Sequence, residues 1–151
     1  MLGLGTWKAL RRRGVMGINQ RNAGIIMPYN QRRYFPLVDD KARTKLLASQ
    51  ANIPVPEQYG LIGTERDIRR IVQIAEEHRD FVIKPARGAG GDGILVITDR
   101  FEDLYQTASG RMVAQDQLEF YISGIISGLY SLGGQRDQAL VEYRVTSTEL
   151  F

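Results

Sequence analysis

The hydrophobic pattern is clearest between residues 81 and 97, where two short apolar runs flank a glycine-rich stretch. The runs cover residues 81–83 and 94–97, and their β-branched and large apolar side chains favour strands. The sequence therefore predicts a β-hairpin whose loop contains four glycines: Gly88, Gly90, Gly91 and Gly93.

Apolar residues spaced three to four positions apart predict four helices. An acidic or hydroxyl side chain stands ahead of each of the first three: Asp39 or Asp40, then Thr64, then Asp99. Such side chains accept hydrogen bonds from the free N–H groups at a helix start. The predicted helices cover residues 41–51, 68–75, 101–108 and 116–129.

Further short apolar runs predict strands at residues 59–62, 112–114 and 139–145. Residues 1–38 have no secure periodicity and are expected to be irregular, although residues 10–18 could begin as a helix and end as a short strand. Helices and strands are mixed along the chain without a regular strand–helix–strand series. We therefore expect the α+β class.

Composition excludes several kinds of site and partner. The chain has 151 residues, of which 43% are hydrophobic and 25% are charged, and this is ordinary for a globular protein. It has no cysteine and a single histidine, so thiolate and multi-histidine metal sites are excluded. The net charge is only +3, and the basic clusters at residues 11–13 and 32–33 are short, so we expect no nucleic-acid partner.

The hydrophobic segments also bear on location. No apolar run approaches the length of a membrane span. The N-terminus has no basic leader followed by an apolar segment and a cleavage site. We therefore expect a cytoplasmic protein with no membrane partner.

Lys84 and the glycine-rich loop form the strongest candidate for chemistry. Successive N–H groups in such a loop can form a nest for phosphate oxygens, and Lys84 supplies a positive charge where the first strand ends. Residues 88–93 fit G-x-G-x-x-G, but a strand follows instead of the helix that a dinucleotide-binding fold needs. No Gly-Lys-Ser or Gly-Lys-Thr is present to make a Walker loop. The pattern alone leaves phosphate binding and a plain hairpin about equally supported.

Three motifs in order resemble the nucleotide-binding region of the ATP-grasp superfamily. Asp40-Lys41 with Thr44-Lys45 and the turn at residues 53–56 resembles its opening. FVIKPARGAGGDGILVI resembles its lysine-bearing strand and mobile glycine-rich loop, and VEYRV at residues 141–145 resembles its hinge strand. More narrowly, Gly17-Ile-Asn19, Arg21-Asn22, Tyr29-Asn30 and the stretches 34–41 and 127–134 are similar to the alpha-L-glutamate ligase-related branch, whose members include ribosomal-protein glutamate ligases.

The resemblance implies an ATP-dependent ligase that phosphorylates a small carboxylate and lets an amine attack the acyl phosphate. It implies ATP and Mg²⁺ as cofactors, with lysines on the phosphates and the hinge on adenine and ribose. It assigns no catalytic residue and no metal ligand to this chain. The implied nucleotide-binding residues are Lys41, Lys84, Arg87, Gly88, Gly90, Gly91, Gly93, Glu142, Tyr143, Arg144 and Val145.

By the same resemblance, residues 1–78 are an N-terminal lobe, 79–140 a lid subdomain with the glycine-rich loop, and 141–151 a hinge strand. The family's magnesium ligands lie on a C-terminal catalytic lobe after the hinge, whereas nine residues follow Glu142 here. We therefore expect that lobe to be missing and this chain to be the inactive N-terminal portion of such an enzyme. Asp92, Glu142 and Glu149 are the only acids near the matching region, and they offer no preorganised pair. The alternatives are a nucleotide- or phosphate-binding module without catalysis and a structural domain. The oligomeric state is open.

Overall fold

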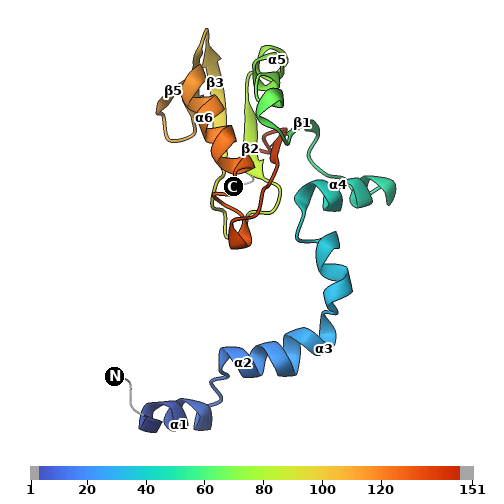
Figure 1. Cartoon of the computed structure of the whole chain (residues 1–151), viewed down its shortest axis with the longest axis vertical. Coiled ribbons are helices and arrows are strands. Elements are labelled where there is room, and N and C mark those ends of the chain that lie inside the picture. Colours follow the sequence, from blue (N-terminus) through green and yellow to red (C-terminus); the bar gives the residue numbers. More distant parts are fainter. Residues whose placement is uncertain (1–3, 147–151) are drawn as a thin grey trace, which may run out of the picture. The chain divides into compact units, whose positions relative to one another are not determined.

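A computed structural model describes residues 4–146, and the chain divides into two compact units, one ending at Val38 and the other beginning at Asp39 (Figure 1). The first unit is helical rather than irregular, which corrects the expectation for residues 1–38. Apart from the nine-residue α1, its helices have three to six residues, which is too few turns to establish a periodic pattern. They are α1 (Leu4–Arg12), α2 (Ile18–Arg21), a π-helical segment (Asn22–Ile26), α3 (Met27–Tyr29) and a 3-10 helix (Arg32–Leu37).

The second unit is built on one antiparallel sheet with the strand order β1-β6-β2-β3-β4-β5. The last strand of the chain therefore lies between β1 and β2. The predicted boundaries after residues 78 and 140 lie within this unit, and strands from all three predicted segments share its sheet. The strands are β1 (Gln58–Ile62), β2 (Phe81–Pro85), β3 (Leu95–Phe101), β4 (Leu104–Thr107), β5 (Met112–Ala114) and β6 (Ala139–Glu142).

The predicted hairpin around the glycine-rich loop is confirmed. β2 pairs antiparallel with β3, and Phe81, Val82 and Ile83 face Ile97, Val96 and Leu95 in register. Both strands are longer than the apolar runs that predicted them, because they continue into the polar residues Lys84 and Thr98. The loop between them therefore begins after Pro85.

Three helices of the second unit also agree with the pattern. They are α4 (Lys41–Gln50), α5 (Arg70–Glu77) and α6 (Gln115–Ile126). Asp40 caps α4 as expected, because its carboxylate accepts the N–H groups of Ala42 at 3.0 Å and Arg43 at 3.2 Å. Thr64 makes no side-chain cap: its hydroxyl donates to the Asp67 carboxylate at 2.7 Å, ahead of a 3-10 turn (Glu65–Asp67).

The predicted helix over residues 101–108 is wrong. β3 continues to Phe101, and a two-residue turn at Glu102 and Asp103 leads into β4. Glu102 has a left-handed backbone (φ 54°), which lets the chain reverse so tightly. Tyr105 and Thr107 are buried with Gln106 between them on the other face, so the real period is two. The apolar residues of this segment fit both periods, and sheet pairing decides between them.

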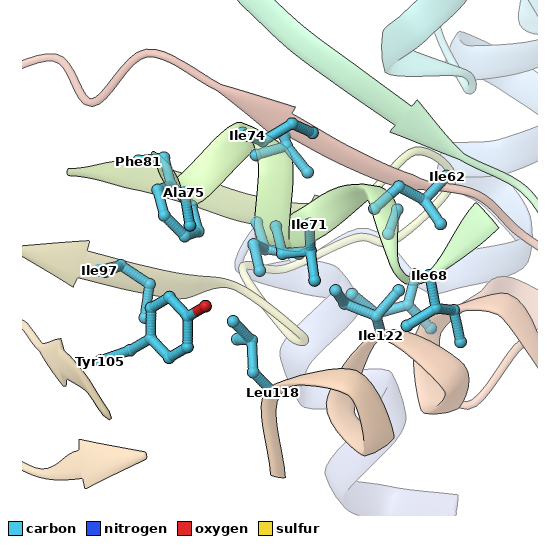
Figure 2. Packing of buried hydrophobic residues seen from close by; sticks show 14 of the residues in the cluster. Ile62, Ile68, Ile71, Ile74, Ala75, Phe81, Ile97, Tyr105, Leu118 and Ile122 are labelled. Atoms are coloured by element: carbon cyan, nitrogen blue, oxygen red, sulfur yellow. The ribbon is translucent and has the colours of Figure 1, made fainter. Parts of the chain in front are cut away.

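The core lies on one face of the sheet, beneath α5 and α6. Figure 2 shows side chains of α5 and α6 directed toward Phe81, Ile97 and Tyr105. Full burial of an isoleucine, leucine, valine or phenylalanine side chain stabilises the folded state by about 1.5–3 kcal/mol. The buried cluster comprises Ile62, Ile68, Ile71, Ile74, Ala75, Phe81, Ile83, Ile97, Tyr105, Val113, Leu118, Ile122, Ile125, Ile126, Ala139 and Val141.

β6 ends at Glu142 rather than at residue 145. Residues 147–151 of the predicted hinge segment, including Glu149, lie outside the described residues. Among residues 4–146, no helix has the length and apolar character needed to cross a membrane.

Candidate functional site

Lys84 and Glu142 project from the sheet face opposite the core. In the β2–β6 pairing, Val82 faces Glu142 and Lys84 faces Leu140. Side chains alternate between faces, so Lys84 and Glu142 are diagonal neighbours on one face. Ile83 and Val141, which alternate with them, belong to the core on the other face. The strand pattern therefore places a cation and an anion together without any loop.

The Glu142 carboxylate lies between two lysines. Its Oε1 pairs with Lys84 Nζ, and its Oε2 lies 2.5 Å from Nζ of Lys45 on α4. The exposed fractions of the three side chains are 6% for Glu142, 11% for Lys45 and 22% for Lys84. Burying a carboxylate is costly unless it is paired, and the two ammonium groups meet that requirement. The Glu142 carboxylate thus contacts these two lysines, whereas the sequence interpretation directed it at adenine or ribose.

Lys41 lies at the base of the glycine-rich loop. Its backbone N–H donates to the Ala86 carbonyl at 2.9 Å, and its Nζ donates to the Gly88 carbonyl at 2.5 Å. Burial lowers the pKa of Lys41 below 10.5, and the nearby charge of Lys84 lowers it further, while Asp137 and Asp40 oppose the shift. The first turn of α4 is therefore joined directly to the loop.

The glycine-rich loop is held against the segment that follows α6. Gly90, Gly91 and Gly93 have positive φ angles, which glycine adopts without strain, whereas Gly88 does not. A Cβ at Gly93 would come within 2.5 Å of the Tyr130 ring, so only glycine allows that close approach. Gly88 forms an isolated β-bridge with Ser131. The loop and residues 129–131 together line an open hollow formed by Ala89, Gly90, Asp92, Gly93, Leu129, Tyr130 and Ser131.

The other residues of the predicted nucleotide site are distributed differently. The exposed Arg87 guanidinium lies near the loop base, with Nε 3.3 Å from Asp40 Oδ2. The Tyr143 N–H donates to the Glu57 carbonyl at 2.8 Å. Arg144 pairs with Asp80 at 3.6 Å, at the end of β2 away from the loop. The structure therefore brings Lys41, Lys84, Arg87, Glu142 and the glycines to one end of β2, but not Arg144.

This arrangement is cationic and suited to phosphate. The chain has four lysines, and three of them, Lys41, Lys45 and Lys84, gather around the loop base and Glu142. Lysine offers a compact charge with three donors, and glycine-rich loops offer backbone N–H groups, so both favour bound phosphate oxygens. The family model described as sugar-transfer associated ATP-grasp matches residues 20–151.

The chain belongs to this ATP-grasp family.

No curated protein and no solved structure matches this ATP-grasp protein. The family match confirms the ATP-grasp resemblance, and the mixed helices and antiparallel sheet agree with the α+β prediction. The description of the matching family does not extend to the narrower glutamate ligase-related branch.

Sequence reasoning missed two residues of this candidate site. Lys45 follows Lys41 by one helical turn, so both lie on one side of α4, and that spacing could have identified it. Asp137 is 4% exposed and accepts two hydrogen bonds from the Arg87 N–H, at 3.1 and 3.0 Å. It follows a glycine-rich turn without any periodic signal, so only the tertiary structure reveals it.

Magnesium does not fit the side chains described. In residues 4–146, no group of three or more His, Cys, Asp or Glu side chains could hold a metal ion. The nearest candidate, Glu142, already has both carboxylate oxygens paired with lysines. We therefore assign no metal ligand and no metal-dependent step to these residues.

Proposed function

We propose that this chain supplies the ATP-binding portion of an ATP-dependent carboxylate–amine ligase. The main support is the cluster of Lys41, Lys45 and Lys84 beside the glycine-rich loop. The buried Glu142 carboxylate pairs with two of these lysines. Family membership supports ATP as the ligand.

The two lysines of the Glu142 pair are suited to an exchange of partners. The single negative charge of Glu142 offsets one of the two positive charges of Lys45 and Lys84 in a shielded position. When phosphate enters, Lys84 gains a second anionic partner while Glu142 retains Lys45. Charge-assisted hydrogen bonds of this kind are roughly twice as strong as neutral ones. Glu142 therefore acts by holding Lys84 extended, and adenine recognition is left to the backbone that follows β6, near Tyr143 and Val145.

The proposed reaction is a phosphoryl transfer followed by an acyl transfer. The γ-phosphoryl group of ATP passes to a substrate carboxylate, releasing ADP, and an amine then displaces phosphate to form an amide. Such catalysis depends mainly on positioning and charge stabilisation. Lys41, Lys84 and the loop N–H groups would hold the phosphates, and loop closure would exclude water. We propose residues 79–140 as the part that closes.

Two resemblances bear on the class of substrate. The similarity of residues 17–41 and 127–134 to glutamate ligase-related proteins supports an amino acid as the amine. The family description mentions sugar transfer, so acids and amines carried on sugars belong in the same screen. A non-catalytic nucleotide-binding module is the alternative, supported by the lack of a metal-binding cluster in the described residues.

Calorimetric titration with ATP tests the binding proposal directly. Lys84→Ala removes one charge-assisted phosphate contact worth roughly 1.5–3 kcal/mol, so we expect binding ten- to a hundredfold weaker. Lys8→Ala is the matched control, because Lys8 is the remaining lysine and lies in the first unit. Equal affinity of folded Lys84→Ala and wild type would reject the role of Lys84. Steady ADP release by this chain that depends on both an acid and an amine would show catalysis, and it would contradict the expectation that the chain is only the inactive ATP-binding portion.

A further inference from the structure

Asp137 is a buried carboxylate surrounded by backbone donors. Both of its oxygens accept the Arg87 N–H, at 3.1 and 3.0 Å, and Oδ1 also accepts the Gln138 N–H at 2.8 Å. The residue is 4% exposed. It lies just before β6, whereas Arg87 is fifty positions earlier, where β2 opens into the glycine-rich loop.

The residue before Arg87 is fixed as well. The Ala86 N–H donates to the Gln138 carbonyl at 2.9 Å, and the Ala86 carbonyl accepts the Lys41 N–H at 2.9 Å. The loop base is thus joined to the segment before β6 on one side and to the start of α4 on the other. Asp137 extends this attachment by one residue, beyond the last strand pairing, into the loop itself.

We propose that Asp137 is a positioning residue for nucleotide phosphates, whose buried carboxylate fixes the first turn of the glycine-rich loop and its neighbour Lys41. The role rests on the proposed function, because it presupposes that the loop and Lys41 meet phosphate. Asp137 itself touches no phosphate; a negative group aimed at the ligand would repel it. Instead, its charge is directed at backbone N–H groups beneath the loop.

The charge of Asp137 also acts on Lys41. Burial and the charge of Lys84 lower the pKa of Lys41. The carboxylates of Asp137 and Asp40 raise this pKa, and Asp137 has the larger effect of the two. A lysine side chain binds phosphate as a cation only while its amine is protonated. Asp137 therefore favours the binding form of Lys41 while its hydrogen bonds hold the loop base.

Asparagine at position 137 separates this role from simple packing. It preserves size and one acceptor oxygen, but it removes the charge and turns an NH₂ group toward one of the N–H donors. Asp99→Asn is a matched control, because Asp99 accepts the Arg100 N–H at 2.8 Å and pairs with Arg79 far from the loop.

Three measurements on the full chain test the positioning role of Asp137. They are amide exchange of residues 87–93, ATP affinity, and titration of Lys41 by side-chain NMR. In Asp137→Asn we expect exchange of the Arg87 N–H to be at least tenfold faster, ATP binding about tenfold weaker, and the Lys41 pKa lower. Asp99→Asn should leave all three at their wild-type values. If Asp137→Asn does not fold, Asp137→Ser, which is smaller and retains an acceptor, replaces it.

Loop exchange and ATP affinity unchanged in Asp137→Asn would overturn the positioning role. So would equal changes in both variants, because they would reflect general destabilisation. Failure of the wild-type chain to bind ATP would count against the proposed function instead. In that case, the exchange and Lys41 measurements would still show whether Asp137 holds the loop base.

Discussion

The two faces of the central strands show how one sheet serves two purposes. On one face, Ile83 and Val141 are fully buried in the core cluster, which also contains side chains of α5 and α6. On the other, Lys84 and Glu142 alternate with them and pair with Lys45 of α4. Both faces are shielded, but one is stabilised by apolar contact and the other by matched charge.

This difference explains why the ionic face is the candidate site. A hydrophobic core gains nothing from a polar ligand, whereas a carboxylate between two lysines can share one of them with a phosphate. Buried ion pairs are often no more stable than apolar substitutes. The charges on this face are therefore weak evidence for stability, and this agrees with the binding role that we propose for them.

The largest expected effect comes from the core face. Ile83→Ala should lower the free energy of unfolding by about 2–5 kcal/mol, because it removes buried methyl groups and leaves a cavity. Val82 is half-buried on the opposite face, one position away. Val82→Ala should therefore lower the free energy of unfolding by only about 1 kcal/mol. Urea denaturation of both variants measures the contrast, and similar losses would show that the two faces are packed alike.

Glu142→Gln should produce the next largest effect. It preserves the shape of the side chain but leaves Lys45 and Lys84 without a buried counter-charge. Hydrogen bonds to charged groups contribute about 1.5–3 kcal/mol, so we expect a loss of that order in the free energy of unfolding.

A triple variant, Lys45→Met, Lys84→Met and Glu142→Leu, sharpens this result. Replacing a buried ionic cluster with apolar groups is often neutral or stabilising by about 1–4 kcal/mol. We expect stability near the wild-type value together with loss of ATP binding. A severe loss of stability in the triple variant would mean that the ionic cluster is needed for folding.

Alkaline pH should change the free energy of unfolding in opposite directions through Lys41 and through Tyr121. This is the smallest of the expected effects. The pKa of Lys41 is lowered from 10.5, so the unfolded chain binds more protons just below pH 10.5, and stability rises with pH there. On the helix side, burial raises the pKa of Tyr121 from 10.0 to about 12. The folded chain then holds the phenol proton between pH 10 and 12, so stability falls as pH rises.

Thermal denaturation between pH 8 and 12 separates these contributions. Lys41→Met should remove the rise below pH 10.5, and Tyr121→Phe should make the fall above pH 10 shallower. Profiles identical to wild type in both variants would show that neither group titrates as its surroundings imply.

The local sequence pattern was sufficient to predict an element where its apolar residues fitted a single period and a cap or turn residue marked its end. The glycine-loop hairpin, α5, α6 and the Asp40 cap of α4 all follow from residues adjacent in sequence. Lys84 was recognisable because it stands at the end of the first strand, four positions before the first glycine of the loop. At Tyr105 the pattern allowed two periods, and pairing with β3 and β5 selected the strand.

What the sequence alone determined is therefore the set of local elements and the cation beside the loop. The tertiary structure decided which distant groups share that site. β6 enters the sheet between β1 and β2, bringing Glu142 to Lys84 and, just before the strand, Asp137 to Arg87. Such contacts span fifty or more residues and leave no periodic trace, because hydrogen bonding and charge pairing depend on where the strands meet in space.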